Sequence, residues 1–307
     1  MQEKSDAVDV VIVGGGPAGL SAGLILGRAR RSVVICDHGQ PRSWASKAMH
    51  GFITREGMDP RALRARAREE LAAFPKVLFR SAEVTHVSVT SGGFSVSAGE
   101  TIDCRKLLIA TGMRDTLPPF PNIESYFGKS VLQCPYCDGW ECRDMPIAVY
   151  GPGRRGFEMA RAMSAWTPDI VLCTDGPAGL SPKQRSLLKR NNIPVIENSI
   201  KELEGADGHL TAILFADREK LPRSAMFFDL PAHGQSNLGA ILGCDVDAHG
   251  RIKCGKYEAT DVPGVFAAGN VIDDVQLSIV AAAEGARAAF GINLALTRED
   301  FEKGRPT

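Results

Sequence analysis

The sequence has few cysteines, no surplus of charge of either sign and no long apolar run. Its eight cysteines are too sparse among 307 residues for a disulfide-stabilised scaffold. Lysine plus arginine and aspartate plus glutamate both number 36, and no basic run occurs, so a nucleic-acid partner is not expected. No stretch reaches the roughly 18 apolar residues of a membrane helix, and the start lacks a signal-peptide pattern. These absences favour a cytoplasmic protein that acts on small molecules or on other proteins, without a membrane partner.

Two stretches share the order strand, glycine turn, helix, strand. The first has an apolar β-branched run at residues 9–13, then glycines, a small-residue helix at 20–27 and a strand at 32–36. The same order returns between residues 146 and 174. Parallel strands need a helical crossover, so each stretch predicts a βαβ unit. The fold class is therefore predicted to be α/β, with two Rossmann-like, three-layer nucleotide-binding domains, the second inserted in the first.

The segments between these units suggest where the chain crosses from one domain to the other. Residues 117–121 (LPPFP) are the natural first linker, and residues 243–253 are a plausible return. Within the first domain, residues 76–97 alternate apolar and polar side chains around two glycines and predict a hairpin. Residues 61–73 predict a charged helix whose arginines form a solvated face.

Gly14, Gly16 and Gly19 follow the first strand in the G-x-G-x-x-G pattern and precede its helix. Glycines there let the backbone approach a pyrophosphate, whose charge is held by amides and the positive end of the helix. Asp37 ends the second strand, where a ribose hydroxyl needs a carboxylate acceptor. A lone glycine pattern can also be a plain tight turn, but the strand, helix and acidic residue together predict a bound dinucleotide.

Cys134 and Cys137 stand three positions apart in VLQCPYCDGW, with Asp138 directly behind them. The other six cysteines have no regular spacing. A zinc site would need two more ligands at short spacing, and Cys142 is the sole nearby candidate, so no metal is expected. An inert structural pair is the second alternative. The thiolate is the reactive form of cysteine, so this pair with its adjacent proton acceptor favours a dithiol that cycles to a disulfide.

Three segments taken together, residues 107–112 (LLIATG), 134–139 (CPYCDG) and 260–270 (TDVPGVFAAGN), resemble the signatures of low-molecular-weight thioredoxin reductases. The resemblance covers residues 10 to about 289. It implies a homodimer with an FAD-binding domain in two parts, residues 1–116 and 244–307, and an inserted NAD(P)-type domain, residues 117–243, that carries the cysteines.

The resemblance also implies roles for single residues. Cys137 would exchange electrons with the flavin and Cys134 with the substrate, while Asp138 would serve as the acid–base group. Asn270 stands where the family has aspartate, and Gln276 comes one residue earlier than the family's glutamine. The residues expected to bind FAD are Gly14, Gly16, Pro17, Ala18, Gly19, Asp37, Ala110, Thr111, Gly112, Gly269, Asn270 and Gln276.

The inserted domain departs from the family where NADPH would bind. Family members hold the 2′-phosphate with a His-Arg-Arg run after the second strand, but residues 173–176 read Cys-Thr-Asp-Gly. Asp175 would repel a 2′-phosphate, although it could accept from a free ribose hydroxyl. Arg154 and Arg155 add bulk and charge to the glycine loop, either to clamp a phosphate or to fill a vacated site. NADPH is therefore not expected to bind, while NADH, or no nucleotide at all, stays open.

A branch of this family without NADPH determinants includes flavin dithiol oxidases that close disulfides in gliotoxin-like and holomycin-like metabolites. The Cys-Pro-Tyr-Cys sequence and residues 50–55 (HGFITR) resemble that branch. The first hypothesis is therefore oxidation of a small-molecule dithiol, with oxygen as acceptor. The second is a thioredoxin-disulfide reductase that takes electrons from NAD(P)H or another donor for a thioredoxin-like protein. The third is a flavin-loaded redox sensor or scaffold without turnover.

Overall fold

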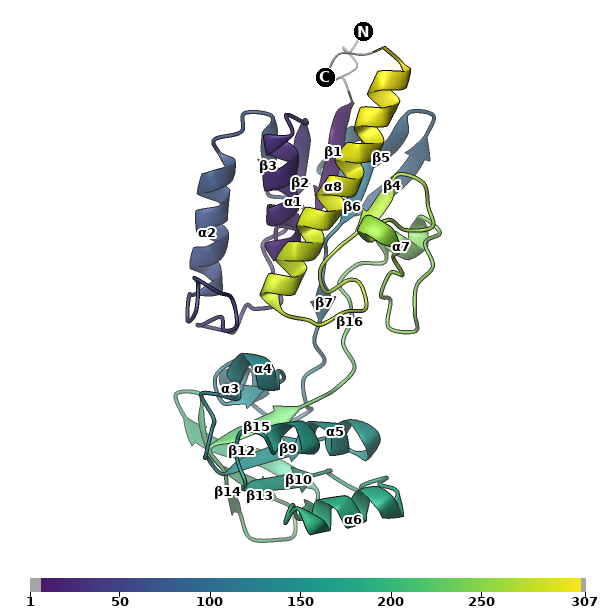
Figure 1. The fold of residues 1–307 in the computed structure, drawn as a ribbon. Helices are drawn as coiled ribbons and strands as arrows, with labels where there is room; N and C mark the ends of the chain where they lie inside the picture. Colours follow the sequence, from purple (N-terminus) through teal and green to yellow (C-terminus); the bar gives the residue numbers. More distant parts are fainter. Residues whose placement is uncertain (1–6, 305–307) are drawn as a thin grey trace. The chain divides into compact units, whose positions relative to one another are not determined.

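The computed structural model describes residues 7–304 and divides into two compact units (Figure 1). Unit 1 comprises residues 7–44, Pro60–Arg114 and residues 232–304, and unit 2 comprises Ala45–Asp59 and Asp115–Pro231. The contacts thus differ from the expected boundaries in two longer segments, besides residues 115–116, which fall in unit 2. Residues 45–59 pack with unit 2, and residues 232–243 pack with unit 1. Residues 1–6 lie outside the described residues. They are part of the N-terminal segment for which the sequence predicts no signal peptide.

Unit 1 is built on a seven-stranded sheet in the order β3-β2-β1-β6-β5-β4, with β17 also paired to β6. Strands β1, β2, β3, β6 and β17 run parallel, whereas β4, β5 and β6 form antiparallel pairs. The central strand β1 is apolar on both sides because both faces of the sheet are covered. The strands are β1 (Val8–Val13), β2 (Val33–Cys36), β3 (Val77–Arg80), β4 (His86–Thr90), β5 (Gly93–Ala98), β6 (Glu100–Ile109) and β17 (Val265–Ala267).

The expected hairpin within residues 76–97 begins later than the alternation predicts. Strand β3 pairs parallel with β2, in the register Val33 with Val77, and belongs to the main sheet. Only β4 and β5 form the antiparallel hairpin. The first part of the stretch alternates because β3 is an edge strand, a position that period-two polarity cannot distinguish from a hairpin arm.

Helices α1 (Pro17–Arg28) and α8 (Ser278–Glu302) lie side by side over one face of this sheet (Figure 1). Their close approach depends on Gly285, because a Cβ atom there would stand 2.0 Å from the carbonyl oxygen of Ala18. Ala288, Ala289 and Ile292 of α8 fill the same core. The remaining elements of unit 1 are α2 (Pro60–Leu71), β7 (Met113–Arg114), β16 (His233–Gly234), α7 (Leu238–Ile241) and the 3-10 turn η1 (Lys256–Glu258).

Unit 2 repeats the βαβ plan on a five-stranded parallel sheet in the order β11-β10-β9-β15-β8. Its helix α5 (Gly153–Met163) follows β9, as α1 follows β1, which confirms the second Rossmann-type unit. A separate antiparallel sheet has the order β12-β13-β14. The other elements are α3 (Ile123–Tyr126), β8 (Val131–Leu132), α4 (Pro135–Asp138), β9 (Ile147–Tyr150), β10 (Ile170–Cys173), α6 (Pro182–Arg190), β11 (Val195–Ile196), β12 (Ile200–Ala206), β13 (His209–Phe215), β14 (Leu221–Pro222) and β15 (Ala225–Phe228).

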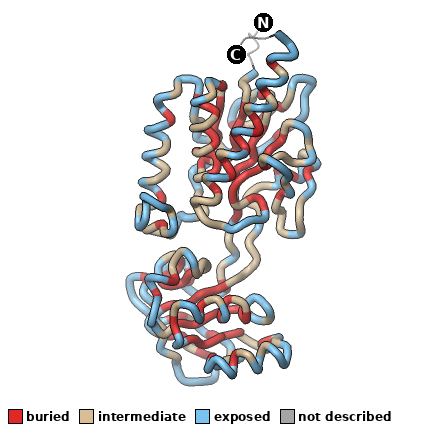
Figure 2. The backbone as a smooth tube through the Cα atoms, viewed as in Figure 1, coloured by how far each residue is buried: buried red, intermediate tan, exposed pale blue. Residues whose placement is uncertain are grey.

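The inner strands of both main sheets, such as β1, β9 and β15, are among the most deeply buried parts of the chain, whereas the edge strands β3 and β4 are largely exposed (Figure 2). Helix α8 differs from the sequence-based expectation, because among the described helices it alone is long and apolar enough to cross a membrane. That test uses length and composition only. In the structure, α8 packs on α1 and carries two buried carboxylates, Glu284 and Asp300.

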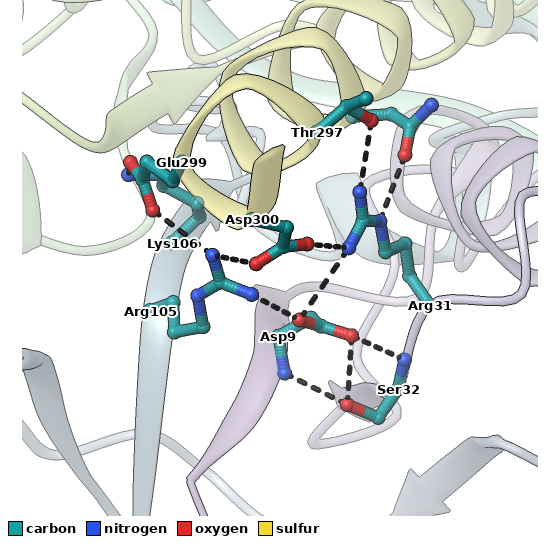
Figure 3. Close-up of polar contacts among 9 residues, drawn as sticks. Asp9, Arg31, Ser32, Arg105, Lys106, Thr297, Glu299 and Asp300 are labelled. Carbon is teal, nitrogen blue, oxygen red and sulfur yellow. Dashed lines mark hydrogen bonds and ion pairs between the residues drawn. The ribbon is translucent and has the colours of Figure 1, made fainter. Parts of the chain in front are cut away.

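A buried ion cluster joins the C-terminal part of α8 to the sheet of unit 1 (Figure 3). Asp300 Oδ2 lies 2.6 Å from Arg31 Nη1, and its Oδ1 lies 2.6 Å from Arg105 Nη2. Asp9 Oδ1 accepts a second hydrogen bond from Arg105 at 2.9 Å. Asn293 and Thr297 accept from the other nitrogens of Arg31. Two arginines are therefore neutralised by two aspartates at this end of the sheet.

Candidate active site

The cysteine pair lies on the short helix α4 of unit 2, where Cys134 and Cys137 form a disulfide. Cys134 has extended backbone angles, and Pro135 begins the helix, a position where its fixed φ and missing amide cost nothing. The Cys134 sulfur accepts a hydrogen bond from the Cys137 amide at 3.1 Å. An amide donor stabilises negative charge on a sulfur, so Cys134 is the cysteine better prepared to exist as a thiolate.

The indole of Trp166 packs against α4 and the glycine that follows it. A Cβ atom at Gly139 would lie 2.4 Å from the Pro135 carbonyl and 2.8 Å from the indole, so only glycine fits. Tyr136 meets the same indole edge-on at 5.5 Å, and it is otherwise exposed. Trp140 is also exposed, and the Arg143 guanidinium lies 4.2 Å from the centre of its ring. Trp166 lies 27 residues beyond Gly139 in the chain, and no local pattern in the sequence indicates that it packs against the cysteine helix.

Asp138, the predicted acid–base residue, ends α4. Burial raises the pKa of Asp138 to about 6, while the charge of His50 opposes the rise and that of Glu141 adds to it. Burial disfavours a charged carboxylate, so the group gains or loses its proton near neutral pH instead of near pH 4. A carboxyl group in this range can accept a proton from one thiol and return it to another.

Residues 45–59 bring a histidine to this part of unit 2. His50 Nδ1 is hydrogen-bonded to Glu56 Oε1 at 2.6 Å, and it lies 3.7 Å from Glu141 Oε1. The sequence shows these residues only as part of the stretch that resembles the dithiol oxidases. Their packing against the cysteine helix arises from long-range contacts, for which the sequence holds no local signal.

Residues of the first glycine turn leave room for a bound phosphate. Gly14 has a φ of +116°, and a Cβ there would stand 2.2 Å from the Ala110 carbonyl. Gly19 packs closely against Gly14, because a Cβ atom on Gly19 would stand 1.9 Å from the Gly14 carbonyl oxygen. At Gly16, in contrast, a Cβ atom would meet nothing within 4 Å. The two outer glycines are thus needed to pack the turn, and the middle one faces open space at the start of α1, beside Pro17.

Asp37 lies beside this turn, as the sequence predicts. A Cβ atom on Gly15 would be 2.5 Å from its Oδ2, and Gly39 donates its amide to Oδ1 at 3.1 Å. Arg68 of α2 pairs with Oδ2 at 2.5 Å and lies over Phe79. Arg68 is exposed, as expected for the solvated face of α2, and in addition it pairs with Asp37. One side of the carboxylate is occupied by this arginine, because α2 packs close to the end of β2.

The two later segments of the predicted dinucleotide site also belong to unit 1. The Ala110 amide donates to Val13 at 2.8 Å, which places Thr111 and Gly112 just beyond the ends of β1 and β6. The Thr111 hydroxyl lies 3.3 Å from the Ser236 hydroxyl. Ser236 comes from residues 232–243, which the sequence had assigned to the other domain.

The turn after β17 contains Gly269 and Asn270. Gly269 has a φ of +80°, and its amide donates to the buried Glu284 at 2.7 Å. Burial raises the pKa of Glu284 to about 7, although this hydrogen bond opposes the shift. Asn270 is partly exposed at the end of the turn. Gln276 accepts a hydrogen bond from Arg42. Sequence reasoning missed Glu284, which is the buried anchor of this turn.

The second glycine turn has the same packing as the first but a different environment. A Cβ atom on Gly156 would stand 1.9 Å from the Gly151 carbonyl, matching the pair Gly19 and Gly14. The amide of Gly153, however, donates to the Ala178 carbonyl at 2.7 Å, and the Gly179 carbonyl lies 3.8 Å from a Cβ built on Gly153. The chain itself therefore occupies the position that is open at Gly16.

Two charged residues of the inserted domain, Asp175 and Arg155, bind other groups of the protein. Asp175 has a left-handed φ of +51° and accepts the amide of Ile200 at 2.7 Å. One oxygen of the Asp175 carboxylate thus holds the start of β12, and the other oxygen can still accept a hydrogen bond. Arg155 pairs with Asp229 at 3.0 Å instead of pointing to a phosphate.

The six other cysteines are free thiols, five of them buried. Burial raises the pKa of Cys104, Cys173 and Cys254 to about 12, and that of Cys36 and Cys142 to about 11. A thiol that stays protonated is a poor nucleophile, so these cysteines differ chemically from the pair on α4. Within residues 7–304, no group of three or more His, Cys, Asp or Glu side chains could hold a metal ion.

Known proteins share this architecture along nearly the whole chain. A probable thioredoxin reductase of Arthroderma benhamiae is 30% identical over 96% of this chain and 81% of its own length. The crystal structure of HlmI is 36% identical, with a TM-score of 0.92, and the match covers 97% of this chain and 95% of that one. The putative thioredoxin reductase TrxB from Bacillus anthracis is 31% identical, with a TM-score of 0.90 over 95% and 99% of the two chains.

The family comparison covers both units. The model of one family, pyridine nucleotide-disulphide oxidoreductase, matches residues 8–285, a range that includes both glycine turns and the cysteine helix. The resemblance to thioredoxin reductases inferred from the three sequence segments is thereby confirmed. The chain belongs to the pyridine nucleotide-disulphide oxidoreductases and is a thioredoxin reductase-like oxidoreductase.

Proposed function

We propose that this protein is an FAD-dependent dithiol/disulfide oxidoreductase in which Cys134 reacts with the substrate, Cys137 exchanges electrons with the flavin and Asp138 moves the proton. The observation that carries the proposal is the Cys134–Cys137 disulfide on α4, directly followed by a carboxyl group whose pKa is raised to about 6. The six other cysteines are free thiols, and the pKa of each is raised by burial. Thiol–disulfide exchange needs a disulfide that can open and a group that accepts protons at neutral pH, and both are provided here.

The exchange conserves atoms and electrons. One substrate thiolate attacks the Cys134 sulfur, which breaks the Cys134–Cys137 bond and releases Cys137 as a thiolate. The second substrate thiol then attacks the substrate sulfur of the mixed disulfide and releases Cys134. The substrate leaves as a disulfide, its two protons pass to Asp138 and to solvent, and its two electrons remain on the cysteine pair. Bound FAD would supply the two-electron acceptor for the reduced cysteine pair, next to Cys137.

Unit 1 is the proposed FAD domain. Gly14, Gly16 and Gly19 would hold the pyrophosphate, with Pro17 and Ala18 opening α1 behind it. Asp37 would accept from the ribose on the side that Arg68 leaves free. The residues proposed to hold the rest of the cofactor are Ala110, Thr111, Gly112, Gly269, Asn270 and Gln276.

The open space at Gly16 allows FAD binding to be tested separately from folding. A Gly16→Asp side chain has room in the protein alone, but it would place a carboxylate where the pyrophosphate must lie. We expect the variant to fold with the unfolding transition of the wild type and to lose FAD affinity by at least about a hundredfold, since like charges repel strongly where water is excluded. Fluorescence titration of the protein with FAD measures this loss.

The matched control is Gly92→Asp in the turn between β4 and β5, where a Cβ atom also meets nothing within 4 Å. It should bind FAD as the wild type does. A Gly16→Asp protein that purifies yellow, with the wild-type flavin content, would contradict the proposed FAD site.

Oxygen is the proposed electron acceptor, with a small-molecule dithiol as substrate. Support comes from the second glycine turn, where Ala178 and Gly179 cover the amide that a nucleotide phosphate would use, and from Asp175 at the place of the family's arginines. A thioredoxin-disulfide reductase that uses NAD(P)H or another donor is the second candidate, favoured by the names of relatives such as that of A. benhamiae. A flavin-loaded sensor without turnover would consume no dithiol.

NADPH should fail to reduce the bound flavin. The missing arginines alone weaken it by about a hundredfold, because each charge-assisted hydrogen bond contributes about 1.5 to 3 kcal/mol. The covered Gly153 amide removes a further contact. In stopped-flow absorbance without oxygen, a small dithiol should bleach the flavin, NADH should do so slowly if at all, and NADPH should not. Admission of air should restore the colour. Bleaching by NADPH faster than by any dithiol would establish the reductase instead.

We also propose a cytoplasmic homodimer. The six free thiols suit a reducing compartment. Phe290 and Leu294 are half-exposed on α8, and Phe290 contacts only Tyr257 among the aromatic rings of the described residues. Apolar side chains exposed together on one helix favour a protein partner, and a second copy of the chain is the partner that the family resemblance implies. Sedimentation velocity tests this assembly.

A further inference from the structure

His50 is held in place by a loop whose hydrogen bonds converge on Glu56. Met49 and Met58 pair across the base of the loop, with the Met49 amide 2.8 Å from the Met58 carbonyl. Glu56 then bridges two groups, since its Oε1 lies 2.6 Å from His50 Nδ1 and its Oε2 accepts the Gly51 amide at 2.9 Å. The Nδ1 atom thus has a fixed partner, and the imidazole ring is oriented by the backbone of the loop.

The imidazole lies among carboxylates that come from two segments of unit 2. Glu56 belongs to its own loop, whereas Glu141 and Asp138 belong to the cysteine helix and the residues just after it. Glu141 Oε1 is 3.7 Å from Nδ1. Burial lowers the pKa of His50, but the Glu56 hydrogen bond and the charges of Glu141, Glu56 and Asp138 outweigh it and raise the pKa above its usual value. His50 is therefore the one basic group among three acids, and these acids favour its protonated form.

We propose that His50, clamped by Glu56, is a positioning residue that keeps Asp138 ionised and so able to accept the thiol proton during exchange at Cys134. This inference deepens the proposed function and depends on it. Asp138 faces two charges, a favourable one from His50 and an unfavourable one from Glu141, and its burial makes the balance between them decisive. The loop of residues 49–58 thereby has a chemical role at the cysteine helix.

The inference has a direct consequence for pH dependence. Without the charge of His50, the pKa of Asp138 rises above about 6, so the acid limb of the exchange rate moves to higher pH. A shift of about one unit lowers the rate roughly tenfold on that limb and leaves it unchanged well above the new pKa. A residue with a purely structural role would lower the rate by the same factor at every pH.

The test compares full-length proteins with His50→Gln and His50→Lys. Each oxidised protein is mixed with dithiothreitol without oxygen, quenched with iodoacetamide at set times and analysed by mass spectrometry of the Cys134 peptide. The ratio of variant to wild-type rate at each pH cancels the ionisation of dithiothreitol itself. We expect His50→Gln to be about fivefold slower near pH 6, about tenfold slower below about pH 5, and equal to wild type above about pH 9. His50→Lys restores the positive charge and should keep the wild-type acid limb.

Three controls decide the interpretation. His209→Gln, at an exposed histidine of β13 in the same unit, should match the wild type at all pH values. Asp138→Asn should be slow, and adding His50→Gln to it should have no further effect, because His50 acts through Asp138. Equal slowing by His50→Gln and His50→Lys at every pH overturns the inference. An Asp138→Asn protein with the wild-type profile overturns both the inference and the proton role in the proposed function, whereas a slow Asp138→Asn with an unchanged His50→Gln overturns the inference alone.

Discussion

Replacement of either active-site cysteine should lower dithiol turnover by at least about a thousandfold, and the two variants should fail at different steps. Cys137→Ser keeps the Cys134 thiol, which accepts the Cys137 amide hydrogen bond through its sulfur and can still form a mixed disulfide with an activated substrate. That disulfide cannot be resolved internally and should accumulate. Cys134→Ser removes the sulfur that forms the mixed disulfide with the substrate and should form no such adduct. Steady-state oxygen consumption gives the turnover, and intact-protein mass spectrometry gives the adduct.

The control for this pair is Cys142→Ala, five positions beyond Cys137 on the same segment. Cys142 is buried, and its thiol pKa is raised to about 11, so the small apolar replacement should leave turnover within about threefold of the wild type. Substantial turnover in the Cys134→Ser, Cys137→Ser double variant would mean that the disulfide is structural and that another group carries the chemistry.

The parts of the fold that the sequence predicted are those with local, periodic signals. Strand β1 and the glycines after it follow from a β-branched run and from packing distances that only glycine satisfies, at Gly14 and Gly19. The second unit repeats this pattern at Gly151 and Gly156, and the structure has the same close approach there. The pairing of Cys134 with Cys137 was also predictable, since the two cysteines stand three positions apart with an aspartate directly behind them.

The parts that the sequence could not predict depend on which distant segments meet. Nothing in residues 45–59 indicates that His50 packs with unit 2, because the loop is held by Glu56 and by contacts with residues about 90 positions away. Ala178 likewise covers the Gly153 amide through a loop without periodicity. No local pattern in the sequence indicates Glu284 or Trp166, and only the structure places them beside the turn after β17 and the cysteine helix, with His50 near Glu141.

The buried ion cluster at the end of α8 is the clearest case of a long-range feature with a large energetic effect. Asp300 and Arg31 are each about 5% exposed, and residues 9, 31, 105 and 300 are far apart in the chain. Without the Asp300 carboxylate, Arg105 keeps Asp9 and Glu299, but the buried Arg31 keeps only Asp9 as an ionic partner, at 3.9 Å. Removing one partner of a buried ion pair typically costs about 3 to 5 kcal/mol. A replacement of all members by apolar residues would not carry the same cost, since the charges would no longer need partners.

Asp300→Asn should therefore lower the free energy of unfolding of unit 1 by about 3 to 5 kcal/mol at neutral pH, because Arg31 and Arg105 lose their shared carboxylate. Urea denaturation followed by circular dichroism and by release of the flavin measures this loss. Glu302→Gln, at an exposed residue of the same helix, is the matched control and should change the free energy by less than about 0.5 kcal/mol.

The pH dependence of the same variant identifies the cause. Burial alone would raise the pKa of Asp300, but hydrogen bonds from Arg105 and Arg31 outweigh it and hold the pKa below its usual range. A carboxyl group with a lowered folded-state pKa contributes fully above its unfolded pKa of about 3.9, and it loses that contribution as the pH falls through the folded value. The difference between the wild type and Asp300→Asn should thus be largest at neutral pH and shrink in acid below about pH 4. A difference that stays constant down to pH 3 would assign the effect to the changed shape of the side chain and would exclude the ion cluster as its source.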